Sequence, residues 1–180
     1  MNKVFVLLGA LATWLLMSCD SLTPSERLLV GKWYDMSENS SDLVTSEVTT
    51  EFREDKSYVA TLKARFVSED EDGYDFQKVV TMSMREKGTW NIEDKIFYTN
   101  TTSLELASIN VEFVGDDVID DKEKIKDVVE SEKKSFYYDC FIPLKKECLG
   151  ERAEKIVTLN EQAFVTIDKD NEKTERHRTE

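Results

Sequence analysis

The side chains with the most distinctive chemistry in this 180-residue sequence are three cysteines and a single histidine. His177 lies between Arg176 and Arg178 in a polar C-terminal stretch, where we expect an exposed ring without a catalytic role. One histidine leaves little for a histidine-based metal site or a serine–histidine–aspartate triad. The sequence contains no nucleophile elbow, phosphate-binding loop or zinc-protease motif. We predict a protein that is not an enzyme, with no catalytic residue, metal or cofactor; a hydrolase is the less favoured alternative.

Cys140 and Cys148 form a candidate pair with seven residues between them. This spacing lacks the Cys-x-x-Cys pattern of zinc sites and redox-active thiols. Outside the cytoplasm a disulfide is permitted, and closing so short a loop would stabilise the fold by roughly 2–3 kcal/mol on the chain-entropy model. We predict a disulfide between these two residues, and two free, buried thiols are the alternative.

The third cysteine, Cys19, follows a short basic start and an apolar run. Lys3 precedes an apolar run over residues 4–17, and the small residue Ser18 stands directly before the cysteine. The run is shorter than the ~20 residues that a membrane-spanning helix needs. The pattern is typical of a secretory signal peptide, and an uncleaved membrane anchor is the alternative.

The segment Leu16-Met17-Ser18-Cys19 resembles the lipobox of bacterial lipoproteins. The resemblance implies that residues 1–18 are removed as a signal peptide and that Cys19 is acylated as the first residue of the mature chain. Each buried CH₂ of such lipid chains contributes ~0.8 kcal/mol, so several chains anchor a protein firmly. We therefore expect a protein held in the bacterial cell envelope by its lipid, with the outer membrane favoured, and a tether over residues 19–27.

Acidic residues outnumber basic ones, with 37 Asp and Glu against 24 Lys and Arg and a formal net charge of −13. Such a chain lacks the basic face that neutralises phosphates, so we predict no nucleic-acid partner. Hydrophobic residues make up 40% of the sequence, which is too many for a disordered chain. The length suits one domain with a core of its own.

Most of the chain from Gly31 onward alternates apolar and polar residues with the period of two that strands show. One such segment runs from Tyr58 to Phe66, and a tight hairpin is expected about residues 93–95. A final hairpin joins residues 156–159 to residues 163–167. Short strands separated by polar turns predict an antiparallel barrel or sandwich, and a closed barrel has no exposed edges.

One segment departs from the period of two. Asp120 can cap a helix with Glu123 at its third position, and Ile125 and Val128 then recur near helical spacing. We predict one amphipathic helix from about residue 122 to about residue 134, in a late insertion. Residues 169–180 are polar and are expected to form a C-terminal tail.

Two further motifs resemble those of a known family. Gly31-Lys32-Trp33 resembles the Gly-x-Trp motif that opens the first barrel strand of lipocalins. A second copy, Gly88-Thr89-Trp90, is followed by an acidic turn and an apolar strand, and resembles the mid-barrel hairpin of bacterial lipocalin-like lipoproteins. The resemblance implies a mainly β fold: an antiparallel, lipocalin-like meander barrel over residues 28–168.

The lipocalin resemblance also implies roles for single residues. Trp33 would pack across the closed end of the barrel, and Gly31 would let the chain turn in beneath it. The family carries an arginine late in the chain, for which Arg176 and Arg178 are the candidates.

The inward faces of the expected strands are rich in aromatic and methionine side chains, which predicts a barrel that holds a small apolar ligand or a lipid. The tentative lining residues are Phe52, Tyr58, Phe66, Phe76, Met82 and Met84. The alternative is a barrel filled by its own side chains, which would act as an accessory protein of the envelope through its surface loops and helix. Besides the membrane, reached by the lipid on Cys19, and the apolar ligand, the sequence specifies no protein partner.

Overall fold

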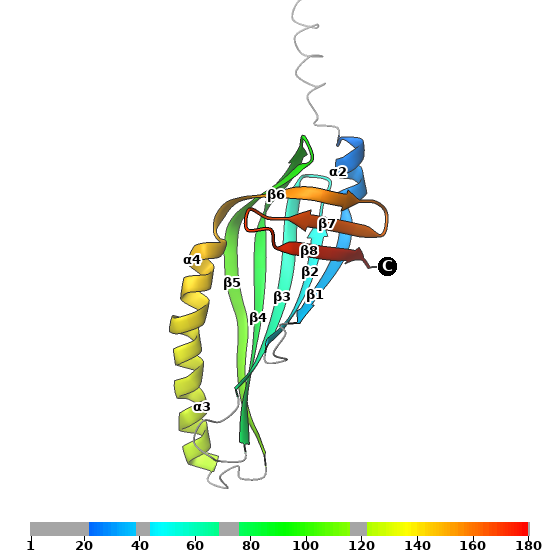
Figure 1. Ribbon diagram of the computed structural model, residues 1–180. Coiled ribbons are helices and arrows are strands. Elements are labelled where there is room, and N and C mark those ends of the chain that lie inside the picture. The colour runs from blue at the N-terminus through cyan, green and yellow to red at the C-terminus, as the bar shows by residue number, and fades with distance from the viewer. Residues whose placement is uncertain (1–21, 39–43, 69–75, 116–121, 180) are drawn as a thin grey trace, which may run out of the picture.

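The computed structural model describes residues 22–38, 44–68, 76–115 and 122–179 (Figure 1). The predicted signal peptide and Cys19 lie outside these residues. Within the described residues, eight antiparallel strands pair in sequence order and the last strand returns to the first. The prediction of a mainly β, lipocalin-like meander barrel with a helix late in the chain is confirmed. The elements are α2 (Pro24–Leu29), β1 (Gly31–Glu38), β2 (Val44–Phe52), β3 (Ser57–Ser68), β4 (Phe76–Glu93), β5 (Ile96–Gly115), α3 (Lys122–Phe136), η1 (Tyr137–Phe141), α4 (Ile142–Cys148), β6 (Gly150–Leu159), β7 (Ala163–Ile167) and β8 (Lys173–Arg178).

The barrel is long on one side and short on the other. β4 and β5 have 18 and 20 residues, whereas β6 pairs with residues 96–101 of β5. In Figure 1, β6, β7 and β8 cross one end of the sheet formed by β2–β5, and α3 and α4 run beside β5 toward the other end. Strands therefore enclose one half of the barrel, and the helical segment lies alongside the other half.

An aromatic core fills the strand-enclosed half. Trp33, Phe52, Phe97 and Phe164 are each at most 3% exposed. Phe97 meets Phe52 and Phe164 nearly edge-on, with ring centroids 5.6 and 5.1 Å apart. Edge-to-face packing of this kind stabilises a core beyond the area that it buries.

Arg178 closes this end of the barrel. Its guanidinium lies 4.5 Å from the centroid of the Trp33 ring. It donates hydrogen bonds to the backbone oxygens of Val30 (2.9 Å), Glu161 (2.8 Å) and Leu28. Two residue pairs join β1 to β8 in the described ladder, so this one side chain contributes much of the closure. Of the two candidate arginines, Arg178 is therefore the one that packs on the tryptophan.

Close contacts explain why glycine stands at the first position of both Gly-x-Trp motifs. Gly31 has a φ of +133°, and a Cβ there would lie 2.3 Å from Nη1 of Arg178. A Cβ on Gly88 would lie 2.2 Å from the backbone oxygen of Asn100 and 2.7 Å from the Tyr58 ring. Neither position has room for a side chain. The glycines let Arg178 and Asn100 approach the backbone closely.

The hairpin expected about residues 93–95 is present between β4 and β5. Its two turn residues, Asp94 and Lys95, have φ angles of 50° and 64°. Positive φ at both central residues matches the twist of the flanking strands, which is the usual geometry of a two-residue hairpin loop.

The helix begins at Lys122 as predicted but does not end near residue 134. It continues through the π-helical turn η1 into α4 and ends at Cys148. Pro143 stands at the start of α4, where its missing N–H is tolerated. The predicted N-cap, Asp120, lies outside the described residues.

The predicted disulfide is wrong, because Cys140 and Cys148 are both free thiols. Both residues lie on the continuous helix, and eight residues at a rise of 1.5 Å place them about 12 Å apart along its axis. A disulfide requires a Cα separation of about 4.4–6.8 Å. Burial raises the pKa of both thiols, so they stay protonated at neutral pH.

The polar tail expected over residues 169–180 is also corrected. Residues 173–178 form β8, which pairs with β7 on one side and β1 on the other. Its inward side chains include Arg176 and Arg178, which lie over aromatic rings where other strands have apolar residues. His177 is exposed, as expected.

The stretch assigned to a tether contains the start of α2. Thr23 and Glu26 form a reciprocal capping box, with Pro24 in the first turn. Such a box satisfies two of the free N–H groups at a helix start. Glu26 is buried and forms an ion pair of 3.0 Å with Lys56 in the turn between β2 and β3. The helix is thus fixed to the closed end of the barrel.

We predict that Arg178→Met lowers the free energy of unfolding by about 2–4 kcal/mol, because three backbone oxygens lose a charged donor. Urea denaturation monitored by circular dichroism measures the change. Arg53→Met is the matched control, since Arg53 is exposed and contacts one exposed carboxylate, that of Glu51. It is expected to change stability by less than about 0.5 kcal/mol. Equal effects of the two substitutions would contradict the role assigned to Arg178.

Candidate functional site

The half of the barrel that the strands do not enclose has an apolar inner face, and the helix covers it. Met82, Met84 and Leu104 from the sheet pack with Phe141 from the helix, and all four are at most 3% exposed. Partly buried apolar side chains extend this contact: Leu62, Phe66, Leu106 and Ile109 from the sheet, and Phe136, Cys140, Leu144 and Cys148 from the helix. This interface, here called the helix-covered face, lies where a lipocalin-like barrel would hold a ligand.

One stripe of the helix makes this contact. Phe136, Cys140, Leu144 and Cys148 recur at intervals of four residues, the spacing that places side chains on one face of a helix. Phe141 widens the stripe and is the most deeply buried of them. The helix therefore packs on the sheet through a narrow apolar seam.

Polar contacts hold the helix near both ends of the seam. Lys78 on β4 forms an ion pair of 2.8 Å with Glu132 in α3. At the other end, Nη2 of Arg152 donates a hydrogen bond of 2.8 Å to the backbone oxygen of Cys148. A cation there satisfies an oxygen that the helix leaves without an internal partner.

A buried polar cluster lies between the aromatic core and the helix-covered face. The Tyr58 hydroxyl donates to Oε1 of Glu86 (2.5 Å), and the Thr101 hydroxyl donates to the same oxygen (2.7 Å). Nη2 of Arg152 reaches Glu86 at 3.5 Å and Thr101 at 3.3 Å. These residues come from β3, β4, β5 and β6, so the cluster ties four strands to the end of the helix through Arg152.

Burial, together with the neighbouring Glu86 carboxylate, raises the pKa of Tyr58. The hydroxyl therefore stays protonated at physiological pH and can donate to Oε1 of Glu86. A tyrosine held in this state is not a base or a nucleophile. The hydrogen bonds of the cluster join β3, β4, β5 and β6.

A second polar group lines the inside of β1 and β6–β8. Glu154 accepts a hydrogen bond from Thr166 and lies 3.6 Å from Nη2 of Arg176. Burial raises the pKa of Asp35, although Arg176 and His177 act in the opposite direction. Charges of both signs thus line the closed half beside the aromatic core.

The structure separates the residues predicted to line a ligand site. Phe52 and Tyr58 belong to the aromatic core, whereas Phe66, Met82 and Met84 lie on the helix-covered face. The side chain of Phe76 is outside the described part of the structure. The predicted set therefore spans two regions, of which the helix-covered face is the candidate site.

The sequence-based reasoning missed the contribution of β5 to this face. Leu104 and Leu106 point inward, as does Ile109, although its position has the opposite parity. The register between β4 and β5 shifts here and leaves Ala107 without a partner, which is a β-bulge. The change of parity between Leu106 and Ile109 is the pattern that could have revealed it.

The fold defines a lipocalin-like β-barrel whose open half is covered by a helix of its own chain. No protein-family model matches this sequence, and a search of curated proteins finds no significant relative. Among the described helices, none combines the length and the apolar character needed to cross a membrane. The geometry of the helix-covered face is therefore what bears on function.

The raised pKa of Tyr58 leads to a prediction of how the stability of the protein depends on pH. The native state keeps this hydroxyl protonated, so its stabilising effect is complete below the unfolded-state pKa of about 10 and is lost as pH rises further. Between pH 10 and 11 the wild type should lose up to about 1 kcal/mol more stability than Tyr58→Phe, measured by urea denaturation. Tyr138→Phe, on a side chain that is 66% exposed, is the control and should follow the wild type. Parallel curves for the wild type and Tyr58→Phe would show that the hydroxyl titrates normally.

Proposed function

We propose that this protein is a lipid-anchored binding protein of the bacterial cell envelope, which holds a small apolar ligand such as an acyl chain on the helix-covered face. The observation that carries the proposal is a continuous apolar inner face that none of the described strands covers and on which one amphipathic helix lies. A ligand would insert between helix and sheet and replace the contacts of the helix.

The side chains of the sheet suit a flexible apolar ligand. Met82 and Met84 form the centre of the face, and methionine adapts its unbranched side chain to partners of different shape. Leu62, Leu106 and Ile109 surround them with further apolar surface. Such a lining binds through burial of area rather than through directed hydrogen bonds.

The contacts that hold the helix on the sheet support the idea that the helix can move away from it. The helix satisfies its own backbone hydrogen bonds, so lifting it breaks no strand pairing. On the α3 side of the apolar seam, the ion pair between Lys78 and Glu132 joins the helix to the sheet, and both side chains are partly exposed. A pair of this kind contributes roughly 0.2–1 kcal/mol. Its far end is tied more firmly, by Arg152 and the buried polar cluster.

A second function is favoured by the outer surface of the same helix. Val128, Tyr137, Tyr138 and Ile142 are exposed although they are apolar or aromatic. On this reading the barrel stays filled, and the protein is an envelope accessory protein that contacts a partner through the helix. The two functions differ in whether the helix leaves the sheet.

Anchoring through Cys19 is tested by metabolic labelling with palmitate in a bacterial host. We predict that the wild-type chain incorporates label and fractionates with membranes, and that Cys19→Ser loses both properties because Cys19 is the cysteine that stands at the end of the lipobox-like segment. Cys140→Ser and Cys148→Ser are the matched controls and should remain labelled. Label that persists in Cys19→Ser would refute lipidation at this residue.

Ligand binding is tested with cis-parinaric acid, whose fluorescence rises when its chain is buried. We predict saturable binding to the wild type. Glu132→Gln should bind about two- to fivefold more tightly, because its helix opens at lower cost. Glu130→Gln is the matched control: Glu130 pairs with Lys133 in the same helix at 2.9 Å and touches no strand through that pair.

No binding of parinaric acid to any of these variants would reject the apolar-ligand proposal. Recovery from solubilised envelope of one protein whose capture is lost in Tyr138→Ala would then support the accessory function in its place.

A further inference from the structure

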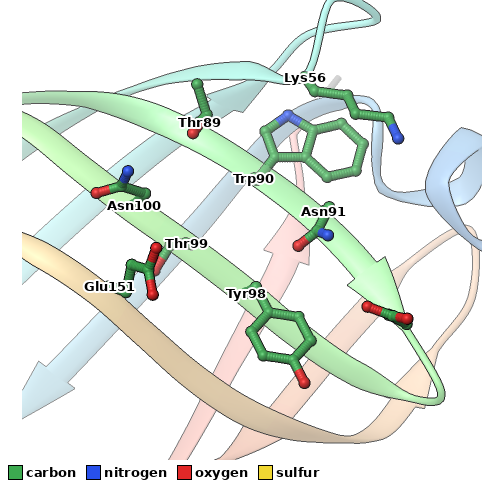
Figure 2. Close-up of a pocket in the computed structure, with 9 residues that line it drawn as sticks. Lys56, Thr89, Trp90, Asn91, Tyr98, Thr99, Asn100 and Glu151 are labelled. Atoms are coloured by element: carbon green, nitrogen blue, oxygen red, sulfur yellow. The ribbon is translucent and has the colours of Figure 1, made fainter. Parts of the chain in front are cut away.

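A hollow of about 450 Å³ lies on the outside of the barrel, over the end of β4, the start of β5 and β6 (Figure 2). Tyr98 presents its ring there and is 39% exposed. Its cross-strand neighbours are Asn91 on β4 and Ala153 on β6. The small alanine leaves one side of the ring uncovered.

Polar side chains surround this ring. In the row next to Tyr98, Asn100 has Thr89 and Glu151 as its cross-strand neighbours. All of these line the hollow, together with Asn91 and Glu93. Figure 2 shows the two amides, the Glu151 carboxylate and the Tyr98 ring on adjacent strands around one space.

Three of these polar side chains have no hydrogen-bond or ion-pair partner within the described part of the chain. No side chain or backbone group there makes a hydrogen bond or an ion pair with the side chains of Asn91, Asn100 or Glu151. By contrast, many of the other described carboxylates are paired, for example Glu105 with Lys87 and Glu175 with Lys173. Two amides and a carboxylate thus offer both donors and acceptors to a ligand.

We infer that this hollow is a binding site for a neutral pyranose saccharide. An aromatic ring packs against the apolar CH face of a sugar ring, and amide and carboxylate groups pair with hydroxyls around its edge. Anionic ligands are disfavoured, because Glu93 and Glu151 lie in the hollow and its one cation, Lys56, is already paired with Glu26. Peptide addition by strand pairing does not apply, since the site is on the face of a sheet rather than at an edge.

The position of the hollow suggests where the saccharide comes from. Lys56 joins the hollow to α2 through Glu26, and Trp90 beside it donates from its indole N–H to the backbone oxygen of Ser57 at 3.0 Å. The site is therefore at the closed end, close to where the described chain starts. On the proposed acylation of Cys19, two residues stand between the lipid-bearing cysteine and Leu22, and the three steps from Cys19 to Leu22 span at most about 11 Å. A glycolipid headgroup and a soluble glycan strand share the required chemistry, and the second can bind without an anchor.

The saccharide site is tested with the full mature chain in two arms. In the first, chitohexaose, cellohexaose and maltohexaose are titrated while tryptophan emission is recorded, because Trp90 borders the hollow whereas Trp33 does not line it. We expect at least one of them to bind with saturation. Tyr98→Ala should weaken that binding at least tenfold, and Asn100→Ala should weaken it severalfold. Tyr98→Phe should retain it, because stacking needs the ring and not the hydroxyl.

Tyr138→Ala is the matched control, an exposed tyrosine on the helix, and should bind like the wild type. In the second arm, Cys19→Ser protein is added to phosphatidylcholine vesicles with and without glucosyl diacylglycerol. Binding that depends on the sugar lipid identifies a headgroup as the source. Binding of the soluble oligosaccharides alone identifies a glycan strand.

Absence of binding in both arms, or binding that Tyr98→Ala leaves unchanged, would overturn the saccharide site. Neither result depends on acylation of Cys19 or on the apolar ligand. Failure of this inference is thus distinguishable from failure of the proposed function.

Discussion

The contact between Arg178 and Trp33 is the constraint on which the barrel depends. A sheet that closes must join its last strand to its first, and the ladder between β8 and β1 is short. A guanidinium donates in several directions at once, so one side chain binds β8 to the oxygens of Val30, Glu161 and Leu28. The guanidinium also lies over the indole ring of Trp33, and this cation–π attraction stabilises the positive charge beside the aromatic core. Gly31 is required because a side chain there would occupy the same space.

Closure of the barrel at the aromatic core determines what happens at its opposite end. β6, β7 and β8 are short and pair around the aromatic core, so they leave the far part of β4 and β5 without strands opposite. The inner face there is apolar, and exposed apolar surface of that extent is costly in water. The helix resolves this by covering the face with one stripe. Arg152 lies where the two halves meet and links the helix end to Glu86 and Thr101.

Much of this architecture follows from local patterns, and the parts that do not have identifiable reasons. Alternation from Tyr58 to Phe66 predicts β3 because one face of that strand is apolar. Alternation does not predict β8, because its inward residues Arg176 and Arg178 are charged. These side chains fit inside the barrel only because aromatic rings from distant strands lie beneath them. The spacing of Cys140 and Cys148 suits a disulfide loop and a helix equally, so it could not decide between them. Alternation places Met82 and Met84 on the inward face of β4, and they lie there in the structure, but no local pattern shows that a later helix covers this face.

The energetics of the helix set a limit on the ligand of the proposed function. Lifting the helix exposes chiefly the buried Phe141 and the partly buried Phe136 and Leu144, each of which contributes at most roughly 1.5–3 kcal/mol, the value for full burial. A ligand must recover a comparable free energy from its own burial, at ~0.8 kcal/mol for each CH₂. An acyl chain therefore needs about six to eleven buried methylenes before it competes with the helix. On the proposed function, short-chain acids fall below this threshold, so the helix would select for long chains, to which the side chains of Met82 and Met84 can adapt.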